Sequence, residues 1–267
     1  MYQLTFWNGN KSVVRQQYEL QVLTEVVRTW HRQPWHINND VTNFPKAEDE
    51  GSVLSGFADV TVTVAGNSKF AGRAKIVIDQ PIAKGLLGLR LLIIKRAQCL
   101  RFAKVGEQAD LKPLRAGIPA TWADAEILRA NGCQVVERGS FEEVFARLKR
   151  DEFDYVSLGA NEVLDVYHNM VGDDPELMIE PTLMLYYPLP LVFYVAPDQL
   201  DLADHIRTGL QQIERNGVLA QCFDDYYGFP VRQLNLSQRR VIELDNPLLQ
   251  GKLAGYQSPL MTTAKAM

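Results

Sequence analysis

The stretch Leu183-Met-Leu-Tyr-Tyr-Pro-Leu-Pro-Leu-Val-Phe-Tyr-Val195 decides the fold, together with Leu86-Leu-Gly-Leu-Arg-Leu-Leu-Ile-Ile94. Both are extended apolar runs, and each joins two series of alternating strands and helices. A chain that leaves one lobe, builds a second and returns makes two such crossings. Two lobes joined by paired extended crossings predict a hinge, and the cleft between the lobes is a natural site for a small molecule.

The first series lies before residue 65. Alternating and β-branched patterns predict strands at 3–7, 35–44 and 59–64, and a helix that Ser12 caps lies between the first two. A short helix is expected at 52–57. A β-α-β-α-β order favours a parallel sheet covered by helices.

The second series repeats this alternation. Strands are predicted at 114–118, 134–136 and 153–157, and helices at 123–130, 141–150 and 162–169. After the second crossing, residues 202–217 form a strongly amphipathic helix and 218–227 continue the helical pattern, while the tail from Phe229 is expected to wrap the surface. We therefore predict an α/β fold with lobe 1 at 1–92 and 190–267 and lobe 2 at 93–189.

Composition and charge argue against several classes of protein. The 267 residues carry a formal net charge of -4, which argues against a general nucleic-acid binder. No apolar run approaches the roughly 20 residues that a membrane-spanning helix needs. The N-terminal MYQLTFWNGN lacks the regions of a secretion signal, so we expect either a cytoplasmic protein or a mature form whose signal was removed. Cys99, Cys133 and Cys222 allow one disulfide, and no zinc-type ligand spacing occurs.

Four segments resemble the type 2 periplasmic solute-binding proteins of ABC transporters, in order and spacing from Gln3 to Gly228. They are Leu114-Arg-Ala-Gly-Ile-Pro-Ala-Thr-Trp122, Phe141-Glu-Glu-Val-Phe-Ala-Arg-Leu-Lys-Arg-Asp-Glu-Phe-Asp-Tyr155, Phe193-Tyr-Val-Ala-Pro-Asp-Gln-Leu200, and the helix pair from Leu202 that ends in Tyr226-Tyr227-Gly228. The likeness is to the amino-acid-type branch.

The resemblance implies a two-lobed, monomeric periplasmic protein that closes on a small polar solute, such as an amino acid or small carboxylate. Its partner would be an ABC transporter permease or a sensor protein, and neither a cofactor nor membrane insertion is expected. Some relatives are sensory domains and a few are dehydratases.

Candidate ligand-binding residues in lobe 1 are Arg73, Trp7 and Asn8. The resemblance assigns Arg73 to a ligand carboxylate, which a guanidinium binds with two parallel hydrogen bonds. The segment from Gly66 to Gly72 is longer than the usual turn of the family, so Arg73 is alternatively a solvated surface residue. Trp7 and Asn8 follow the first strand, where ligands of open α/β sheets bind. Trp7 alternatively packs between helix and sheet.

In lobe 2, Thr121 and Trp122 stand at a helix start, whose free N–H groups suit a carboxylate or phosphate. The alternative is that Thr121 only caps the helix, with Asp124 completing a capping pair.

Ser157, Asn161 and Glu162 lie at the end of the strand predicted at 153–157 or follow it. The resemblance implies an acidic residue here that holds a ligand ammonium, and Glu162 matches best. The alternative for Asn161 is a helix cap.

No catalytic motif occurs, so a binding protein without catalysis is the first hypothesis. A dehydratase-like enzyme would need a general acid or base, for which Glu162 is the candidate. A solute-sensing domain is the third hypothesis.

Overall fold

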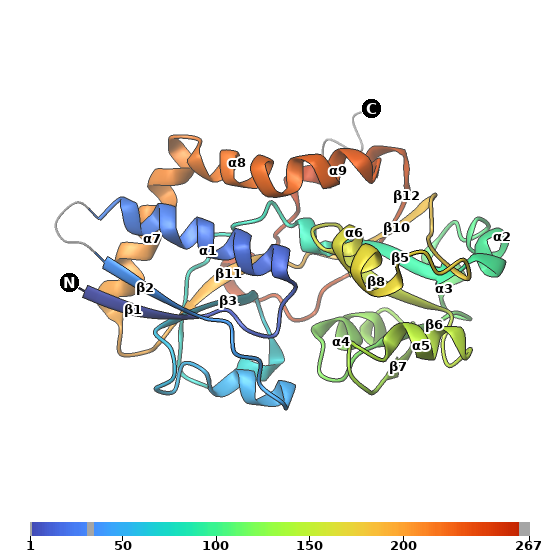
Figure 1. Ribbon diagram of the computed structural model, residues 1–267, viewed down its shortest axis with the longest axis horizontal. Helices are drawn as coiled ribbons and strands as arrows, with labels where there is room; N and C mark the ends of the chain where they lie inside the picture. The colour runs from blue at the N-terminus through green and yellow to red at the C-terminus, as the bar shows by residue number, and fades with distance from the viewer. Residues whose placement is uncertain (1, 31–34, 262–267) are drawn as a thin grey trace. The chain divides into compact units, whose positions relative to one another are not determined.

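The protein, described here by a computed structural model for residues 2–30 and 35–261, divides into two compact units (Figure 1). The first unit comprises Met1–Ala83, Pro190–Phe229 and Gly251–Leu253. The second comprises Lys84–Leu189, Pro230–Gln250 and Ala254–Met267. The α/β fold class predicted from the alternation of strands and helices is confirmed, and each unit holds its own sheet.

A five-stranded sheet forms the centre of the first unit, in the order β2-β1-β3-β11-β4. Strands β1, β2 and β3 are parallel, and β11 runs antiparallel to β3 and β4. The carboxyl ends of the three parallel strands therefore meet at one edge of the sheet, which is where ligand sites of such sheets form. The strand bounds are Tyr2–Trp7 (β1), Trp35–Asp40 (β2), Val60–Val64 (β3), Ile76–Val77 (β4) and Leu191–Val195 (β11).

Two long helices, α1 and α7, pack against each other beside this sheet (Figure 1). Their buried residues recur every three or four positions, as one face of a helix requires. Gly209 allows their close approach, because a Cβ there would lie 2.8 Å from a methyl group of Val26. The helix bounds are Val13–Arg28 (α1), Leu200–Arg215 (α7) and Val218–Phe223 (α8); a π-helical turn, Asp224–Gly228, follows α8.

The second unit is built on a seven-stranded sheet in the order β12-β10-β5-β8-β6-β7, with β9 also paired to β5. Strand β6 is parallel to β7 and β8, whereas β5 is antiparallel to β8. The start of β5 therefore lies beside the carboxyl end of β8, where Arg90 pairs with Gly159. The strand bounds are Leu89–Lys95 (β5), Arg115–Ile118 (β6), Gln134–Glu137 (β7), Tyr155–Gly159 (β8), Leu177–Ile179 (β9), Leu183–Tyr186 (β10) and Arg240–Glu243 (β12).

The helices of the second unit are short, and α5 packs against β5, β6 and β8. Their bounds are Cys99–Phe102 (α2), Gln108–Leu111 (α3), Ala123–Ala130 (α4), Val144–Lys149 (α5) and Val163–Val166 (α6); α9, Phe229–Gln233, begins the C-terminal segment. No helix of the described ranges is long and apolar enough to cross a membrane. The described cysteines are all free.

The run 183–195 passes from the second unit to the first between Leu189 and Pro190, and its two prolines divide it into β10 and β11, which belong to different sheets. Two expectations from the sequence differ from the structure. The short helix expected at 52–57 is a 3₁₀ helix at Ala47–Ser52. The tail does not simply wrap the surface: β12 pairs in parallel with β10, and residues 230–250 join the second unit, whereas the sequence analysis assigned them to lobe 1.

Candidate functional site

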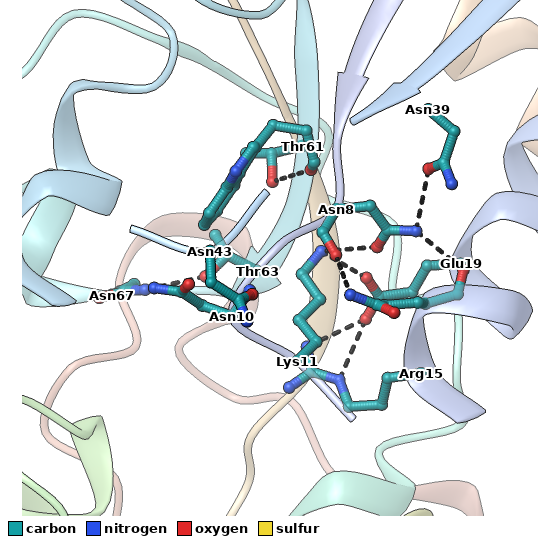
Figure 2. Close-up of polar contacts among 12 residues, drawn as sticks. Asn8, Asn10, Lys11, Arg15, Glu19, Asn39, Asn43, Thr61, Thr63 and Asn67 are labelled. Carbon is teal, nitrogen blue, oxygen red and sulfur yellow. Dashed lines mark hydrogen bonds and ion pairs between the residues drawn. The ribbon is translucent and has the colours of Figure 1, made fainter. Parts of the chain in front are cut away.

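Asn8 lies at the carboxyl end of β1 and is fully buried in the first unit. Its Nδ2 donates to the Gln16 carbonyl at 2.8 Å and to Asn39 Oδ1 at 3.2 Å, and its Oδ1 accepts from Lys11 Nζ at 3.2 Å (Figure 2). Its backbone N–H donates to the Asp40 carbonyl at 2.7 Å. Both ends of the side-chain amide are therefore bound by the chain, and Asn8 joins β1, β2 and α1.

Beside Asn8, the Glu19 carboxylate of α1 binds two cations in what we call the Glu19 triad (Lys11, Arg15 and Glu19). Lys11 Nζ lies 2.6 Å from Glu19 Oε2, and Arg15 Nη2 lies 2.9 Å from Glu19 Oε1 (Figure 2). Glu19 is fully buried. Burial lowers the pKa of the Lys11 ammonium, and the Glu19 carboxylate opposes that shift.

Trp7 is 4% exposed, and its side chain is held within the first unit. The indole N–H donates to the Thr42 carbonyl at 3.0 Å, and the ring lies 5.3 Å from that of Phe44. Its carbonyl accepts from the Thr61 hydroxyl at 2.9 Å. These contacts give Trp7 a packing role at the strand ends, and they leave little of the ring open to solvent.

Arg73 differs from these residues because its guanidinium is exposed and has no partner among the described residues. The preceding segment is fixed by the chain: Asn67 Nδ2 donates to Thr63 Oγ1 at 2.8 Å, and Lys69 Nζ binds Glu50 at 2.9 Å. The glycine at 51 brings two loops together, since a Cβ there would lie 1.9 Å from the Lys69 carbonyl oxygen. An arginine on a fixed loop with a free guanidinium is suited to an anionic group.

The second unit buries a charged side chain inside its central strand. Arg90, in β5, is 1% exposed, and its Nη2 lies 2.5 Å from Asp124 Oδ1 and donates to the Ser157 carbonyl at 2.8 Å. Nη1 donates to the Leu87 carbonyl at 3.2 Å and lies 4.0 Å from Glu162 Oε1. We call Arg90, Asp124, Ser157, Glu162 and Tyr187 the Arg90 cluster.

Tyr187 completes the Arg90 cluster. Its hydroxyl donates to Asp124 Oδ1 at 2.6 Å, and its ring centroid lies 5.7 Å from the Arg90 guanidinium carbon. Burial is the main cause that raises the pKa of Tyr187, so the phenol stays protonated and keeps its role as a donor. Burial opposes the charge of Arg90, but Asp124 and Tyr187 outweigh it and raise the pKa of Arg90.

Asn161 follows β8 and stands out in this part of the molecule. It is 3% exposed, and neither its Nδ2 nor its Oδ1 has a hydrogen-bond partner in the described ranges. The neighbouring Glu162 is 9% exposed, and its Oε1 accepts from the Gly159 N–H at 3.4 Å. The turn after β8 thus presents one bound carboxylate and one unbound amide.

Thr121 and Trp122 form the turn between β6 and α4. Thr121 has a φ of 69°, a left-handed conformation that is uncommon for a β-branched residue. Its N–H donates to Glu137 Oε1 at 3.0 Å, and its hydroxyl is buried without a partner among the residues that the structure describes. The Trp122 ring packs against Phe141 at 5.2 Å. The capping pair considered for Thr121 and Asp124 is absent here, since no side-chain cap is formed at α4 and Asp124 turns to Arg90.

Comparison with solved structures identifies the fold. An arginine-specific periplasmic binding protein of Salmonella typhimurium is 16% identical, with a TM-score of 0.59 over 85% of this chain and 100% of that chain. An arginine transport-system periplasmic binding protein of Legionella pneumophila is 12% identical, with a TM-score of 0.60 over 85% and 100%. The ligand-binding core of GluR0 with L-glutamate is 14% identical, with a TM-score of 0.61 over 85% and 99%.

The fold is that of the type 2 periplasmic solute-binding proteins. No protein-family model matches the sequence, and no curated protein sequence matches it. The likeness is therefore one of structure. The shared solute-binding-protein fold confirms the expectation that the resemblance raised for the architecture.

On this solute-binding-protein fold, the predicted residues fall into separate groups. Trp7 and Asn8 lie at the carboxyl end of β1 in the first unit, and Arg73 lies on a loop of the same unit. In the second unit, the Ser157 carbonyl and Glu162 both contact Arg90, while Thr121 and Trp122 precede Asp124. Within the described residues, no three His, Cys, Asp or Glu side chains are placed to hold a metal ion.

Three residues of the Arg90 cluster were not predicted from the sequence. Arg90 and Tyr187 stood only as members of the two apolar runs, and Asp124 was considered as part of a cap. A signal for Arg90 was present, because a charged residue inside a strand that is apolar on both sides must be buried with a counter-charge. Nothing in the sequence indicated that the counter-charge would be Asp124, 34 positions along the chain.

Proposed function

We propose that this chain is an extracytoplasmic solute-binding protein, which binds a small polar solute, an amino acid or small carboxylate, for uptake by an ABC transporter. One observation carries the proposal: the fold matches amino-acid-binding structures over 85% of this chain and over almost all of theirs. Those proteins bind arginine or glutamate according to their names. A match over almost the whole of the neighbouring chains supports a shared mode of use.

Arg73 supports an acidic group on the solute. Its guanidinium is exposed and has no partner in the described part of the chain, so it is available to bind a carboxylate. The planar guanidinium forms two parallel hydrogen bonds with such a group. The Glu19 triad, by contrast, already pairs its cations and offers no comparable free charge.

The second unit supports a polar solute. Buried polar groups are normally satisfied by hydrogen bonds, and the two free atoms of Asn161 lie among the few that are not. They follow β8 at the end of the strand, a position at which ligands of α/β sheets bind.

A direct binding measurement tests the proposal. The protein is unfolded and refolded to remove any carried solute, and its melting temperature is measured with each of the common amino acids and with small carboxylates. A solute at 100 times its dissociation constant adds about 2.7 kcal/mol to the free energy of unfolding. One or a few solutes should raise the melting temperature, and calorimetry should give one site per chain. A panel without any shift would refute the proposal.

A sensing role is the second candidate, because the GluR0 ligand-binding core matches with a TM-score of 0.61. A sensing domain and a transport protein would both bind the solute, so binding alone does not separate them. Loss of uptake of the bound solute in cells that lack this protein supports transport. Unchanged uptake supports sensing.

A further inference from the structure

The turn after β8 holds an amide whose hydrogen-bonding capacity is unused. Asn161 is 3% exposed, and both its Nδ2 and its Oδ1 are buried without a partner in the part of the chain that the structure describes. A buried polar atom left unsatisfied costs about 1–3 kcal/mol. A group from outside the chain that both donates and accepts a hydrogen bond would remove this cost at both atoms.

The backbone holds this amide in a fixed place. The Ala160 N–H donates to the Leu89 carbonyl at 2.8 Å, and the Glu162 N–H donates to the Gly159 carbonyl at 3.0 Å, which closes a tight turn around Asn161. A binding group on a fixed turn loses little conformational entropy when it binds, which favours affinity.

Gly159 lets the backbone lie in close contact with the Asn161 amide. A Cβ at this position would lie 2.4 Å from Asn161 Oδ1 and 3.0 Å from the Leu87 carbonyl oxygen, so no side chain fits there. The same Leu87 carbonyl accepts from Arg90 Nη1 at 3.2 Å. The Asn161 amide therefore borders the Arg90 cluster.

The two carboxylates of the Arg90 cluster are already engaged, while Arg90 Nε is buried without a hydrogen-bond partner in the described ranges. The Asp124 carboxylate binds Arg90 Nη2 at 2.5 Å and accepts from the Tyr187 hydroxyl at 2.6 Å. The Glu162 carboxylate faces the Gly159 N–H and Arg90. Burying a charged solute group against a neutral amide costs far more than burying an uncharged polar one, because the charge loses its water without gaining a counter-charge.

We infer that Asn161 determines specificity by binding an uncharged carboxamide on the solute, through one donated and one accepted hydrogen bond. This inference rests on the proposed function, and it names the class of solute that the site prefers. The oxygen of a primary carboxamide can accept from Asn161 Nδ2, and its NH2 group can donate to Asn161 Oδ1. A carboxylate offers acceptors alone, and an ammonium offers donors alone.

The test compares solutes that differ in this group. Dissociation constants of L-glutamine, L-glutamate and L-arginine are measured by calorimetry on the refolded protein. L-Glutamine and L-glutamate are nearly isosteric, and we expect L-glutamine to bind at least tenfold more tightly than either of the others. The comparison uses the unmodified protein, so it does not depend on the folding of a variant.

Substitutions at position 161 test whether Asn161 causes the preference for L-glutamine. Asn161→Leu should remove the preference for L-glutamine over L-glutamate, and Asn161→Asp should shift the preference toward L-arginine. Asn169→Leu is the matched control, because Asn169 is exposed and bonds Asp165 on the same helical segment; it should leave the preference unchanged.

The outcomes separate the two proposals. If L-glutamate or L-arginine binds as tightly as L-glutamine, or if a folded Asn161→Leu protein keeps the preference, the inference about Asn161 is wrong and the proposed function stands. If no amino acid or small carboxylate binds at all, the proposed function fails, and the inference fails with it.

Discussion

Both units bury charged side chains near the carboxyl ends of parallel strands, but they complete their hydrogen bonds differently. In the first unit, Glu19 binds Lys11 and Arg15, and the Asn8 amide is bound at both ends. In the second unit, Arg90 binds Asp124, yet the adjacent Asn161 amide has no partner in the ranges described.

This difference indicates two roles for buried polar side chains: they stabilise the fold, or they bind another molecule. A network whose groups are all satisfied holds the strands and helices of its own unit in place. A network with unsatisfied atoms at a strand end has capacity for another molecule. The first unit therefore contributes a scaffold and the Arg73 guanidinium, which has no partner among the described residues, and the second contributes the unsatisfied Asn161 amide.

The largest effect is expected for Glu19→Ala, which tests the scaffold role of the Glu19 triad. The change removes the fully buried carboxylate that both Lys11 and Arg15 contact, so the free energy of unfolding should fall by about 3–5 kcal/mol. Urea denaturation measures this loss.

Glu25→Ala in the same helix is the control for that variant. Glu25 pairs with Arg28, whose side chain is 65% exposed, and such pairs contribute about 0.3–0.5 kcal/mol. If the free energy of unfolding falls equally in the two variants, burial does not make the Glu19 ion pairs stronger than the Glu25 pair. The prediction that Glu19 stabilises the first unit would then be wrong.

A somewhat smaller loss, about 3 kcal/mol, is expected for Arg90→Met, which leaves the buried Asp124 carboxylate without its cation. The double variant Arg90→Met with Asp124→Leu should recover most of this loss, since buried ion pairs are often replaceable by apolar pairs. Urea denaturation of the two single variants and the double variant gives the coupling energy. Additive losses would mean that the two side chains do not act as a pair.

The same two regions show what the sequence predicts well. The alternation of strands and helices before residue 65 and after 114 predicted β1, α1, β3, β6, α4 and β8 with errors of a few residues, because local periodicity reports burial directly. The helix expected at 52–57 failed because that segment contains Gly56, whose φ of 100° is not helical, and only a short apolar run. The pairing of β12 with β10 depends on contacts between residues more than 50 positions apart, which no local pattern reports.

The site was harder to predict than the fold. The position after a predicted strand pointed to Ser157, Asn161 and Glu162, yet it did not show that the Ser157 backbone rather than its hydroxyl contacts Arg90. It also did not show that the Asn161 amide is unbound, because hydrogen-bond partners depend on three-dimensional packing. Arg90 was visible as a charge in an apolar strand, but its partner Asp124 lies on another element.

Arg73→Ala tests the free arginine of the first unit. Since its exposed guanidinium has no partner in the described chain, stability should change by less than about 0.5 kcal/mol. If the proposed function holds, the dissociation constant of the solute should rise at least tenfold, as the loss of a charge-assisted hydrogen bond predicts. Calorimetry measures the constant, and Arg207→Ala, which removes a half-exposed arginine of the same unit that pairs with Asp204, is the control. Unchanged affinity in Arg73→Ala would remove Arg73 from the site.

The smallest effect is expected for Thr121→Gly, which tests whether strain is stored in the turn before α4. A non-glycine residue at a φ of 69° carries about 1–2 kcal/mol of strain, and glycine removes it but adds about 0.5–1 kcal/mol of chain entropy on unfolding. The net result should be a stabilisation of about 0.5–1 kcal/mol, measured as a higher urea midpoint. If the buried Thr121 hydroxyl contacts the solute, the same variant should bind it more weakly, so stability and affinity should change in opposite directions.

Asn235→Gly is the matched control, since Asn235 also has a positive φ, of 49°, but asparagine adopts this conformation at little cost. It should gain less than Thr121→Gly and leave affinity unchanged. A Thr121→Gly protein that is less stable than the parent would mean that the turn is held by its side chain rather than strained by it. The buried hydroxyl would then belong to the scaffold, and the Asn161 amide would remain as the unsatisfied group proposed to bind the solute.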